Sequence, residues 1–523
     1  MTARAVVIGA GIGGLASAAL LAAEGYDVTI LEALPEPGGR VGSWAADGFR
    51  WDTGPSWYLM PEAFDHFFRL LGTSAAEQLE LVPLDPGYRV YFEEQAEPWD
   101  VRADLAANAA LFESAEPGAG RALEAYVASA RQTLDLALDR FLYDTYEDLR
   151  GLAAPELLRR APRLLGLLGR PLHSHVARRF RDPRLQRILD YPAVFLGGSP
   201  YRVPSMYHLM SALDLTGAVL YPRGGFAAVV ERIAALAVER GARLRTRARA
   251  TEILVRGGRA AGVAYTDAAG AARVAEADLV VGAADLHHLE TRLLAPEHRT
   301  YPERSWRSRE PSPGALLVLL GVRGDLPQLA HHTLLFAEDW RGNFEDVFGD
   351  PARVSEAPSL YVCRPSATDP GVAPAGHENL FVLVPIPADP ALGRGGVDGA
   401  GDRSIEHLAD RVIDRIAERA GIPDLADRVV ARRTIGPGDF EADLGAWRGN
   451  ALGLAHTLRQ SAFLRTPNVS RRVRGLYYAG SSTLPGVGVP MCLISAELLL
   501  KRLRGLRGPG RLPEPLVRVG ARP

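Results

Sequence analysis

The sequence predicts an α/β protein in which one parallel-sheet domain is assembled from separated segments of the chain. Three observations favour this fold class. A strand, a glycine-rich turn and a helix follow one another between residues 6 and 24. A second strand, loop and helix pattern, "GLYYAGSSTLPGVGVPMCLISAELLLKRL", lies near the C-terminus. Between the two lie a long stretch of helical periodicity and several apolar strands separated by loops rich in Pro, Gly and Asp.

Length and composition fit a large globular protein. The 523 residues allow two or three domains, and 47% hydrophobic with 23% charged residues is ordinary for a folded chain. The formal net charge of −2 gives no reason to expect a nucleic acid partner. We find no apolar stretch long enough to span a membrane and no secretory signal pattern, and we therefore expect a cytoplasmic location.

The first glycine motif has the spacing of a dinucleotide-binding turn. In Gly-x-Gly-x-x-Gly the first glycine permits the turn, the second admits a pyrophosphate, and the third lets helix and strand pack closely. The helix N-terminus presents its amide groups to the phosphates. An acid at the end of the next strand, about 20 residues further on, accepts hydrogen bonds from a ribose. The residues predicted to bind the dinucleotide here are Gly9, Ala10, Gly11, Gly14 and Glu32.

The following residues distinguish between dinucleotides. "PGGR", residues 37–40, places Gly39 and Arg40 on a turn near the same pyrophosphate. This arrangement resembles the flavoproteins typified by amine oxidases and carotenoid desaturases, which implies FAD as the cofactor. In "FRWDTGPSWYL", residues 49–59, glycine and proline fix a loop. The resemblance places that loop beside the flavin, whereas the alternative is a plain turn; the residues concerned are Gly54, Pro55 and Ser56.

The C-terminal pattern supplies a second set of cofactor contacts. A helix that begins near Met491 directs its N-terminus at the cofactor, where it stabilises negative charge on a reduced flavin. Together with the first motif, more than 450 residues earlier, this pattern indicates a chain that closes around FAD. The residues predicted to contact the cofactor here are Gly480, Ser481, Val489, Pro490 and Met491.

Helical periodicity dominates residues 105–215. Within this region, residues 149–187 carry ten arginines against Glu156 and Asp182, woven between leucines. A basic amphipathic segment of this kind can lie on an anionic membrane surface. The alternative is a solvated helix pair whose arginine stems cover apolar surface.

The remaining segments complete the predicted domain organisation. A glycine turn, a helix and strands after residue 221 return the chain to the cofactor domain, and the strands of residues 311–390 suit a sheet that covers a long apolar ligand. The C-terminal tail is rich in Arg, Pro and Gly. We therefore predict a discontinuous Rossmann-like FAD-binding domain (residues 1–75, 221–300 and 465–504), a substrate-binding domain with a mixed or antiparallel sheet (76–104 and 301–464), a helical, membrane-facing region (105–220) and a disordered tail (505–523).

These blocks together resemble the bacterial-type phytoene desaturases, which are FAD-dependent carotenoid dehydrogenases. The resemblance runs from Val6 to about Leu503, and "FLGGSPYRVPSMYHLMSAL", "LPQLAHHTLLF" and "AGSSTLPGVGVPM" are specific to this branch. It implies desaturation of phytoene to more conjugated carotenes such as lycopene, an apolar polyene substrate and peripheral contact with the cell membrane. Leu484 stands where many members carry histidine. Desaturation at the 3,4 position, or of a modified carotenoid, is therefore an alternative.

The chemistry that the resemblance implies needs few protein groups. Oxidised FAD accepts the hydride, so that the protein must mainly bind, align and exclude water. "PELLRRAPRL" resembles a family stretch with an acid and an arginine near the flavin, which implies Glu156 and Arg159 as catalytic candidates, although both belong to the basic segment.

Two rival functions share the predicted architecture. Amine oxidases usually keep a lysine near the flavin, whereas the only lysine here, Lys501, follows the last cofactor loop. A carrier that resembles the GDP dissociation inhibitors does without FAD, and the retention of Glu32 and Arg40 argues against it. Cys363 and Cys492 lie far apart and lack metal-ligand spacing, so we predict packed thiols and no metal.

Overall fold

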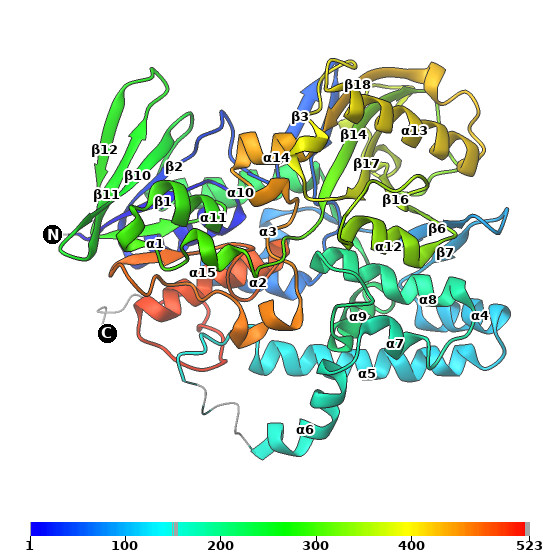
Figure 1. Cartoon of the computed structure of the whole chain (residues 1–523), viewed down its shortest axis with the longest axis horizontal. Coiled ribbons are helices and arrows are strands. Elements are labelled where there is room, and N and C mark those ends of the chain that lie inside the picture. The colour runs from blue at the N-terminus through cyan, green and yellow to red at the C-terminus, as the bar shows by residue number, and fades with distance from the viewer. Residues whose placement is uncertain (1, 149, 151–154, 518–523) are drawn as a thin grey trace.

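Two large sheets, one parallel and one mixed, organise the chain (Figure 1). The computed structural model describes residues 2–148, 150 and 155–517. The parallel sheet lies at the end of the molecule that carries both termini, and the mixed sheet lies at the other end. The helical segment of residues 105–214 lies below the mixed sheet in this view (Figure 1).

The parallel sheet has the strand order β19-β13-β1-β2-β9. Its central strand pairs on both sides, with Val7 opposite Ile30 and Val281. The strand is covered on both faces, which explains its continuous apolar run. The strands are β1 (Arg4–Ile8), β2 (Asp27–Leu31), β9 (Arg243–Arg245), β13 (Leu279–Gly282) and β19 (Leu476–Tyr478).

Three helices from distant parts of the sequence pack together against this sheet. Helix α1 (Ile12–Glu24) contacts both α10 (Gly225–Glu239) and α15 (Val489–Leu503), and their buried side chains form one core with residues of β1, β2 and β13. The small residues of α1, such as Ala16 and Ala19, are fully buried and allow this close packing. Helices α2 (Pro61–Leu70) and α3 (Ala75–Gln78) contribute to the same core.

The mixed sheet has the order β18-β14-β17-β16-β15-β6-β7. Strand β14 presents alternate residues to two layers, because side chains alternate across a strand. Leu316 and Val318 pack against α13 (Arg403–Ala420), whereas Leu317 and Leu319 face the interior of the molecule. The strands are β6 (Tyr88–Phe92), β7 (Trp99–Val101), β14 (Gly314–Arg323), β15 (His332–Phe336), β16 (Leu360–Cys363), β17 (His377–Ile386) and β18 (Val429–Ile435).

Three smaller sheets and four further helices complete these two parts of the fold. Strands β10 (Arg249–Arg256), β11 (Arg259–Thr266) and β12 (Ala272–Glu276) form an antiparallel sheet beside the parallel one. Two strand pairs are β3 (Ser43–Ala46) with β4 (Phe49–Asp52), and β5 (Leu81–Pro83) with β8 (Leu220–Pro222). The helices are α11 (Leu286–His288), α12 (Trp340–Phe348), α14 (Pro437–Leu444) and the single-turn α9 (Ser211–Asp214).

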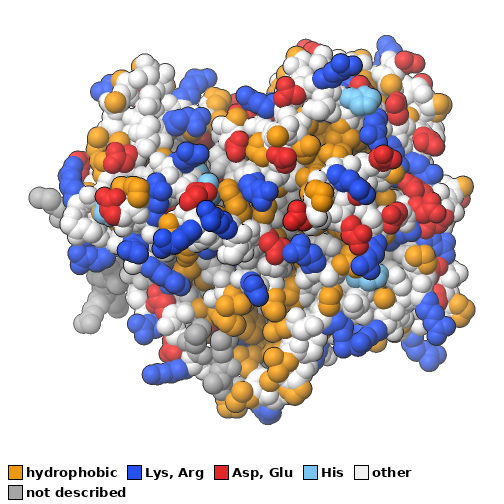
Figure 2. Space-filling model, viewed as in Figure 1, with side chains coloured by type: hydrophobic (Ala, Val, Ile, Leu, Met, Phe, Trp, Pro, Cys, Tyr) orange, Lys and Arg blue, Asp and Glu red, His pale blue; other side chains and the backbone are white. Residues whose placement is uncertain are grey.

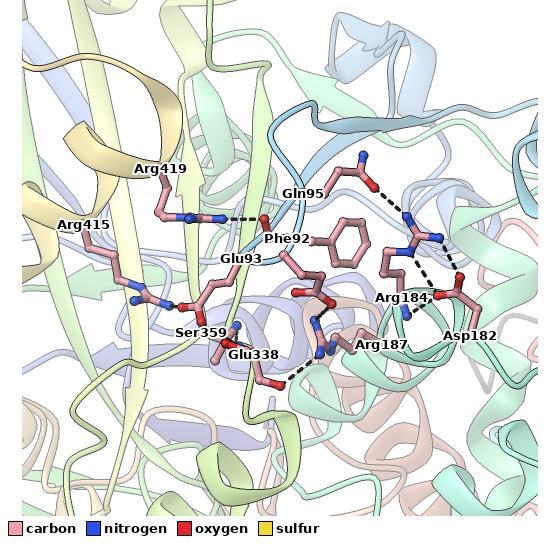
Figure 3. A network of polar contacts seen from close by, with 12 residues as sticks. Phe92, Glu93, Gln95, Asp182, Arg184, Arg187, Glu338, Ser359, Arg415 and Arg419 are labelled. Carbon is pink, nitrogen blue, oxygen red and sulfur yellow. Dashed lines mark hydrogen bonds and ion pairs between the residues drawn. The ribbon is translucent and has the colours of Figure 1, made fainter. Parts of the chain in front are cut away.

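The helical segment is attached to the edge of the mixed sheet by a polar network (Figure 3). Arg187 on α8 donates to Glu94 at 2.7 Å and to the carbonyl of Glu338 at 2.9 Å. Arg415 on α13 pairs with Glu93, which also accepts from the amide of Glu338. The remaining helices are α4 (Leu105–Ala115), α5 (Ala119–Arg140), α6 (Pro155–Leu168), α7 (Leu172–Val176) and α8 (Pro183–Asp190).

Residues 505–517 depart from the disordered tail expected from their composition. The amide of Leu516 donates to the carbonyl of Leu70 at 3.0 Å, and the Glu514 carboxylate contacts the His66 ring. The Lys501 ammonium donates to the carbonyls of Gly508 and Gly510. Buried polar partners, which composition does not reveal, therefore hold this segment.

Candidate active site

A cavity of about 750 Å³ extends from the first glycine motif to the helical segment. One end is lined by Gly9, Gly11 and Glu32, and the other by apolar side chains of α5, α6, α12 and neighbouring loops. Representative apolar lining residues are Leu134, Leu168, Phe195, Met206, Phe336 and Phe344. A polar cradle and a long apolar chamber thus share one continuous space.

The first glycine motif forms an open turn at the start of α1. Gly9 adopts a φ of +97°, which favours glycine, and a Cβ on Gly14 would lie 2.0 Å from the Gly9 carbonyl oxygen. A Cβ on Gly11 would meet only the Gly38 carbonyl at 3.7 Å, so this side of the turn faces open space. The helix has no side-chain cap at its N-terminus. Its free amides therefore suit a phosphate.

Glu32 is fixed at the end of β2 by two backbone amides. Its carboxylate accepts from Ala10 at 2.6 Å and from Leu34 at 2.8 Å, and the side chain lines the cavity although it is buried. A carboxylate oxygen accepts more than one hydrogen bond. The remaining lone pairs can therefore accept from the hydroxyl groups of a ribose.

Arg40 brings a partly unsatisfied guanidinium to the same cradle. One terminal nitrogen lies 3.5 Å from Asp285 and 3.2 Å from Asn450, and the buried Nε has no hydrogen-bond partner. A buried donor without a partner is costly. The residues present therefore fit an anionic group such as the pyrophosphate of FAD.

The C-terminal loop also lines the cavity, and its Gly480 lies against the first turn of α1. A Cβ on Gly480 would meet nothing within 4 Å, and Ser481 follows it on the cavity wall. Val489, Pro490 and Met491 form the first turn of α15 and also line the cavity. This second helix N-terminus lies beside the boundary between the cradle and the apolar chamber.

Comparison with known proteins identifies the architecture. The model of the family described as flavin containing amine oxidoreductase matches residues 12–498. The chain belongs to this family. As a member of the flavin containing amine oxidoreductases it is an FAD-dependent oxidoreductase. It falls in their bacterial-type carotenoid desaturase branch, as the sequence predicts.

Two relatives from that branch match almost the whole chain. A carotenoid 3,4-desaturase of Haloarcula japonica is 42% identical over 94% of this chain and 96% of its own length. A zeta-carotene-forming phytoene desaturase of Myxococcus xanthus is 36% identical over 96% of this chain and 93% of its own. An oxidoreductase structure from Methanosarcina mazei superposes with a TM-score of 0.62 at 17% identity, covering 95% of this chain and all of its own. The predicted α/β fold, with a Rossmann-like parallel sheet and a second, mixed sheet, is confirmed, whereas the membrane-facing role of the helical region stays a prediction.

The structure brings most of the predicted site residues of this flavin oxidoreductase together. Ala10 and Gly14 support the glycine turn from behind, and the other predicted cofactor residues line the cavity, including Gly39, Gly54, Pro55 and Ser56. Arg159 is exposed on α6 and is not part of the cavity lining. Glu156 belongs to the same helix, but its side chain lies outside the described residues.

Sequence reasoning missed a buried histidine on the cavity wall. The amide of Val487 donates to Nε2 of His456 at 3.0 Å, so the proton of the neutral ring lies on Nδ1 and points at the Tyr207 hydroxyl, 2.7 Å away. Burial, reinforced by Arg465, holds the pKa of His456 well below its ordinary value. His456 thus connects the C-terminal loop to the helical segment as a neutral group.

Arg465 is a second residue that no sequence pattern indicated. Its guanidinium is buried and donates to the carbonyls of Thr483, Gln460 and Leu454 at 2.9–3.1 Å, and also to that of Ser481. Burial lowers its pKa to about 10, so it remains protonated at neutral pH. A fixed positive charge therefore supports the loop on which Ser481 lines the cavity.

The only lysine of the sequence is engaged by backbone carbonyls outside the cavity lining. Lys501 donates to the carbonyls of Tyr143, Gly508 and Gly510, and it is not part of the cavity lining. Leu484, for which the resemblance led us to expect histidine, lies on the C-terminal loop and is a buried apolar lining residue. The chamber wall at this point is therefore apolar.

Proposed function

We propose that this FAD-dependent oxidoreductase desaturates a carotenoid hydrocarbon. The observation that carries the proposal is the continuity between the cofactor cradle and an apolar chamber in a cavity of about 750 Å³. Binding of an extended polyene in this chamber would bring a saturated C–C bond to the cofactor. The near-complete match to two carotenoid desaturases supports the same conclusion.

The protein contributes binding, alignment and exclusion of water. Bound FAD supplies the hydride acceptor. Two polar pairs on the chamber wall satisfy each other: Tyr207 contacts His456 at 2.7 Å, and Tyr361 contacts Ser56 at 2.6 Å. Because these four polar side chains are paired with one another, they need no polar partner from the ligand, and a hydrocarbon can lie beside them. Alignment in a dry site is therefore the main contribution of these side chains.

Two substrates are proposed for this activity. Phytoene, converted to more conjugated carotenes such as lycopene, follows from the resemblance in the sequence. Desaturation at the 3,4 position of an already conjugated carotenoid is favoured by the 42% identity to the Haloarcula japonica enzyme. The apolar wall at the buried Leu484 is compatible with either hydrocarbon substrate.

We further propose that the chamber receives its substrate from a membrane surface. Exposed apolar side chains lie on α6 and on the loop of residues 458–464, and several residues of both segments line the cavity. Figure 2 shows hydrophobic side chains gathered where Figure 1 places α6. The described helices include none that is long and apolar enough to cross a bilayer. The exposed apolar residues are Leu158, Leu165, Leu458, Phe463 and Leu464.

Arginines of the basic segment differ in their availability to a membrane. Arg159 is exposed, whereas Arg163 donates to Gln132 at 2.6 Å and to Ser129 at 3.0 Å on α5. Arg163 therefore joins α6 to α5, as expected if the basic segment forms a helix pair. We propose that the apolar side chains and Arg159 contact lipid while Arg163 attaches α6 to α5.

Liposomes that carry one carotenoid each test the proposed function. The flavin-loaded protein is incubated with phytoene or with lycopene, and products are separated by chromatography and identified by their absorption spectra. Formation of zeta-carotene, neurosporene or lycopene from phytoene supports the first substrate. Extension of the lycopene chromophore supports 3,4-desaturation. Failure to convert either polyene by protein with full flavin content, with a range of electron acceptors, would overturn the proposal.

A further inference from the structure

Three side chains that can bind a metal meet behind the cavity wall, in a part of the molecule that the proposed function does not use. They are His331, His332 and Cys363, and each is at least 95% buried. One ring nitrogen of each histidine and the thiol sulfur all lie within 4.8 Å of one another. Among the described residues, this is the one group of three or more His, Cys, Asp or Glu side chains that meets at this distance.

Strand pairing produces this arrangement. His332 begins β15 and lies directly opposite Cys363 at the end of the antiparallel strand β16. Paired residues of neighbouring strands project from the same face of a sheet, so the imidazole and the thiol are neighbours. His331 precedes β15, and its ring is 4.6 Å from that of His332, centroid to centroid. The strands thus bring two consecutive histidines next to a cysteine that lies 31 positions after His332 in the sequence.

Both histidine rings have one nitrogen engaged and one unsatisfied. Nδ1 of His331 lies 2.7 Å from the Thr368 hydroxyl, and Nδ1 of His332 lies 2.7 Å from the Tyr361 hydroxyl. The Nε2 atoms of both rings are buried without a hydrogen-bond partner. A hydrogen bond on one ring nitrogen with the other left for an ion is the usual environment of a metal-binding histidine.

Binding of an ion by these residues accounts for one proton. A metal binds a neutral imidazole nitrogen and a thiolate sulfur. A divalent ion would therefore displace the proton of the Cys363 thiol as the metal–sulfur bond forms, with release of one proton for each ion.

We propose that His331, His332 and Cys363 form a zinc-binding site. Because the three ligand atoms lie within 4.8 Å of one another, an ion at their centre would be at most about 2.8 Å from each of them. Bonds to zinc are about 2.0–2.1 Å long for nitrogen and about 2.3 Å long for sulfur. Side-chain shifts of less than about 1 Å therefore bring the three ligand atoms to bonding distance, and a water would take the fourth position. Two imidazoles and a thiolate favour a borderline-soft ion such as zinc(II) over magnesium or calcium.

The site would support the wall of the cavity. The His332 ring stacks on Trp57 at 4.6 Å between centroids, and Tyr361 joins His332 to Ser56. Trp57, Tyr361 and Ser56 all line the cavity. The ion would therefore be separated from the chamber by a single layer of side chains, and it would fix the position of those side chains.

Zinc binding by the purified, flavin-loaded protein tests the proposal. The protein is reconstituted with zinc(II), dialysed against a weak chelator and analysed for its metal content; affinity is measured by competition with a chromophoric chelator. We expect one zinc for each chain and release of one proton on binding. Substitution of cobalt(II) should give a thiolate-to-cobalt absorption band. Wild-type protein that retains no zinc would overturn the proposal.

Matched variants separate coordination from packing. Thr368→Val removes an outer hydrogen-bond partner and should weaken zinc binding by about 10- to 100-fold. Cys363→Ser removes a ligand and should weaken zinc binding by more than this. Cys363→His restores a ligand and should retain zinc without the cobalt–thiolate band. Cys492→Ser, at the other cysteine, should bind zinc as the wild type does. Equal affinity of Cys363→Ser and wild type, with flavin content unchanged, would contradict the assignment.

Discussion

Tyr191 donates its hydroxyl to Oδ2 of Asp214 at 2.8 Å, and Tyr88 donates to the same oxygen at 3.3 Å. Asp214 is buried, and burial raises its pKa to about 6 in spite of these two donors. Tyr191 lines the cavity, so this buried carboxyl lies directly behind the chamber. A carboxyl group with a raised pKa makes stability depend on pH.

The pH dependence of stability should change when this carboxyl is removed. An unfolded aspartate loses its proton near pH 4, whereas native Asp214 keeps it until about pH 6. The native state therefore binds more protons in this interval, and the free energy of unfolding falls as pH rises from 4 to 6. The contribution of Asp214 is about 3 kcal/mol. The free energy of unfolding is measured at pH 4 and at pH 7, and Asp214→Asn should make the change between the two values differ from that of the wild type by this amount. An unaltered change would contradict the assigned pKa.

Arg40 should determine the affinity for FAD. Arg40→Met removes a partly exposed guanidinium whose buried Nε has no protein partner, while it keeps an apolar stem of similar length. A hydrogen bond to a charged group contributes about 1.5–3 kcal/mol, so the dissociation constant of FAD should rise by about 10- to 100-fold. Titration of the flavin-free protein with FAD, followed by quenching of the flavin fluorescence, measures this dissociation constant. Arg341→Met, at an exposed arginine, is the control, and equal affinity of the two variants would refute the role of Arg40.

Glu156 should contribute little to the chemical step. Its neighbour Arg159 is exposed and not part of the cavity lining, and the chamber can act by alignment alone. Glu156→Gln should therefore lower carotenoid consumption in liposomes by less than about 10-fold, whereas loss of a positioned base costs about 10²- to 10⁴-fold. Met491→Arg, which places a charge on the chamber wall, should nearly abolish consumption. An inactive Glu156→Gln with full flavin content would establish Glu156 as an acid or base.

Membrane binding should depend on apolar side chains as well as on charge. Leu165 and Phe463 are 69% and 50% exposed, and each large apolar side chain that enters a bilayer contributes about 1.5–3 kcal/mol. Leu165→Ser combined with Phe463→Ser should reduce co-sedimentation with anionic liposomes at least about tenfold. Added salt should weaken the wild type further because it screens arginine. Val274→Ser, at an exposed valine on β12, is the control. Undiminished sedimentation of the double variant would place the membrane contact elsewhere.

Local spacing made the cofactor cradle predictable, because Gly9, Gly11 and Glu32 act through a strand, a turn and a helix that are contiguous in the sequence. His456 and Arg465 were not predictable, because their roles arise from contacts with Val487 and Ser481 on a separate loop. The pair of histidines in "LPQLAHHTLLF" was a signal for the cluster with Cys363, but only the register of β15 and β16 reveals the third member.

The strand order of the parallel sheet determines when it can form during synthesis. The central strand β1 is made first, yet its neighbour β13 begins at residue 279 and the edge strand β19 at residue 476. At about 5–20 residues per second, β1 waits roughly 15–55 s for β13 on the ribosome. During that interval its apolar residues and one row of backbone groups remain unpaired. Nascent chains of this protein should therefore depend on chaperones until almost the last strand has emerged.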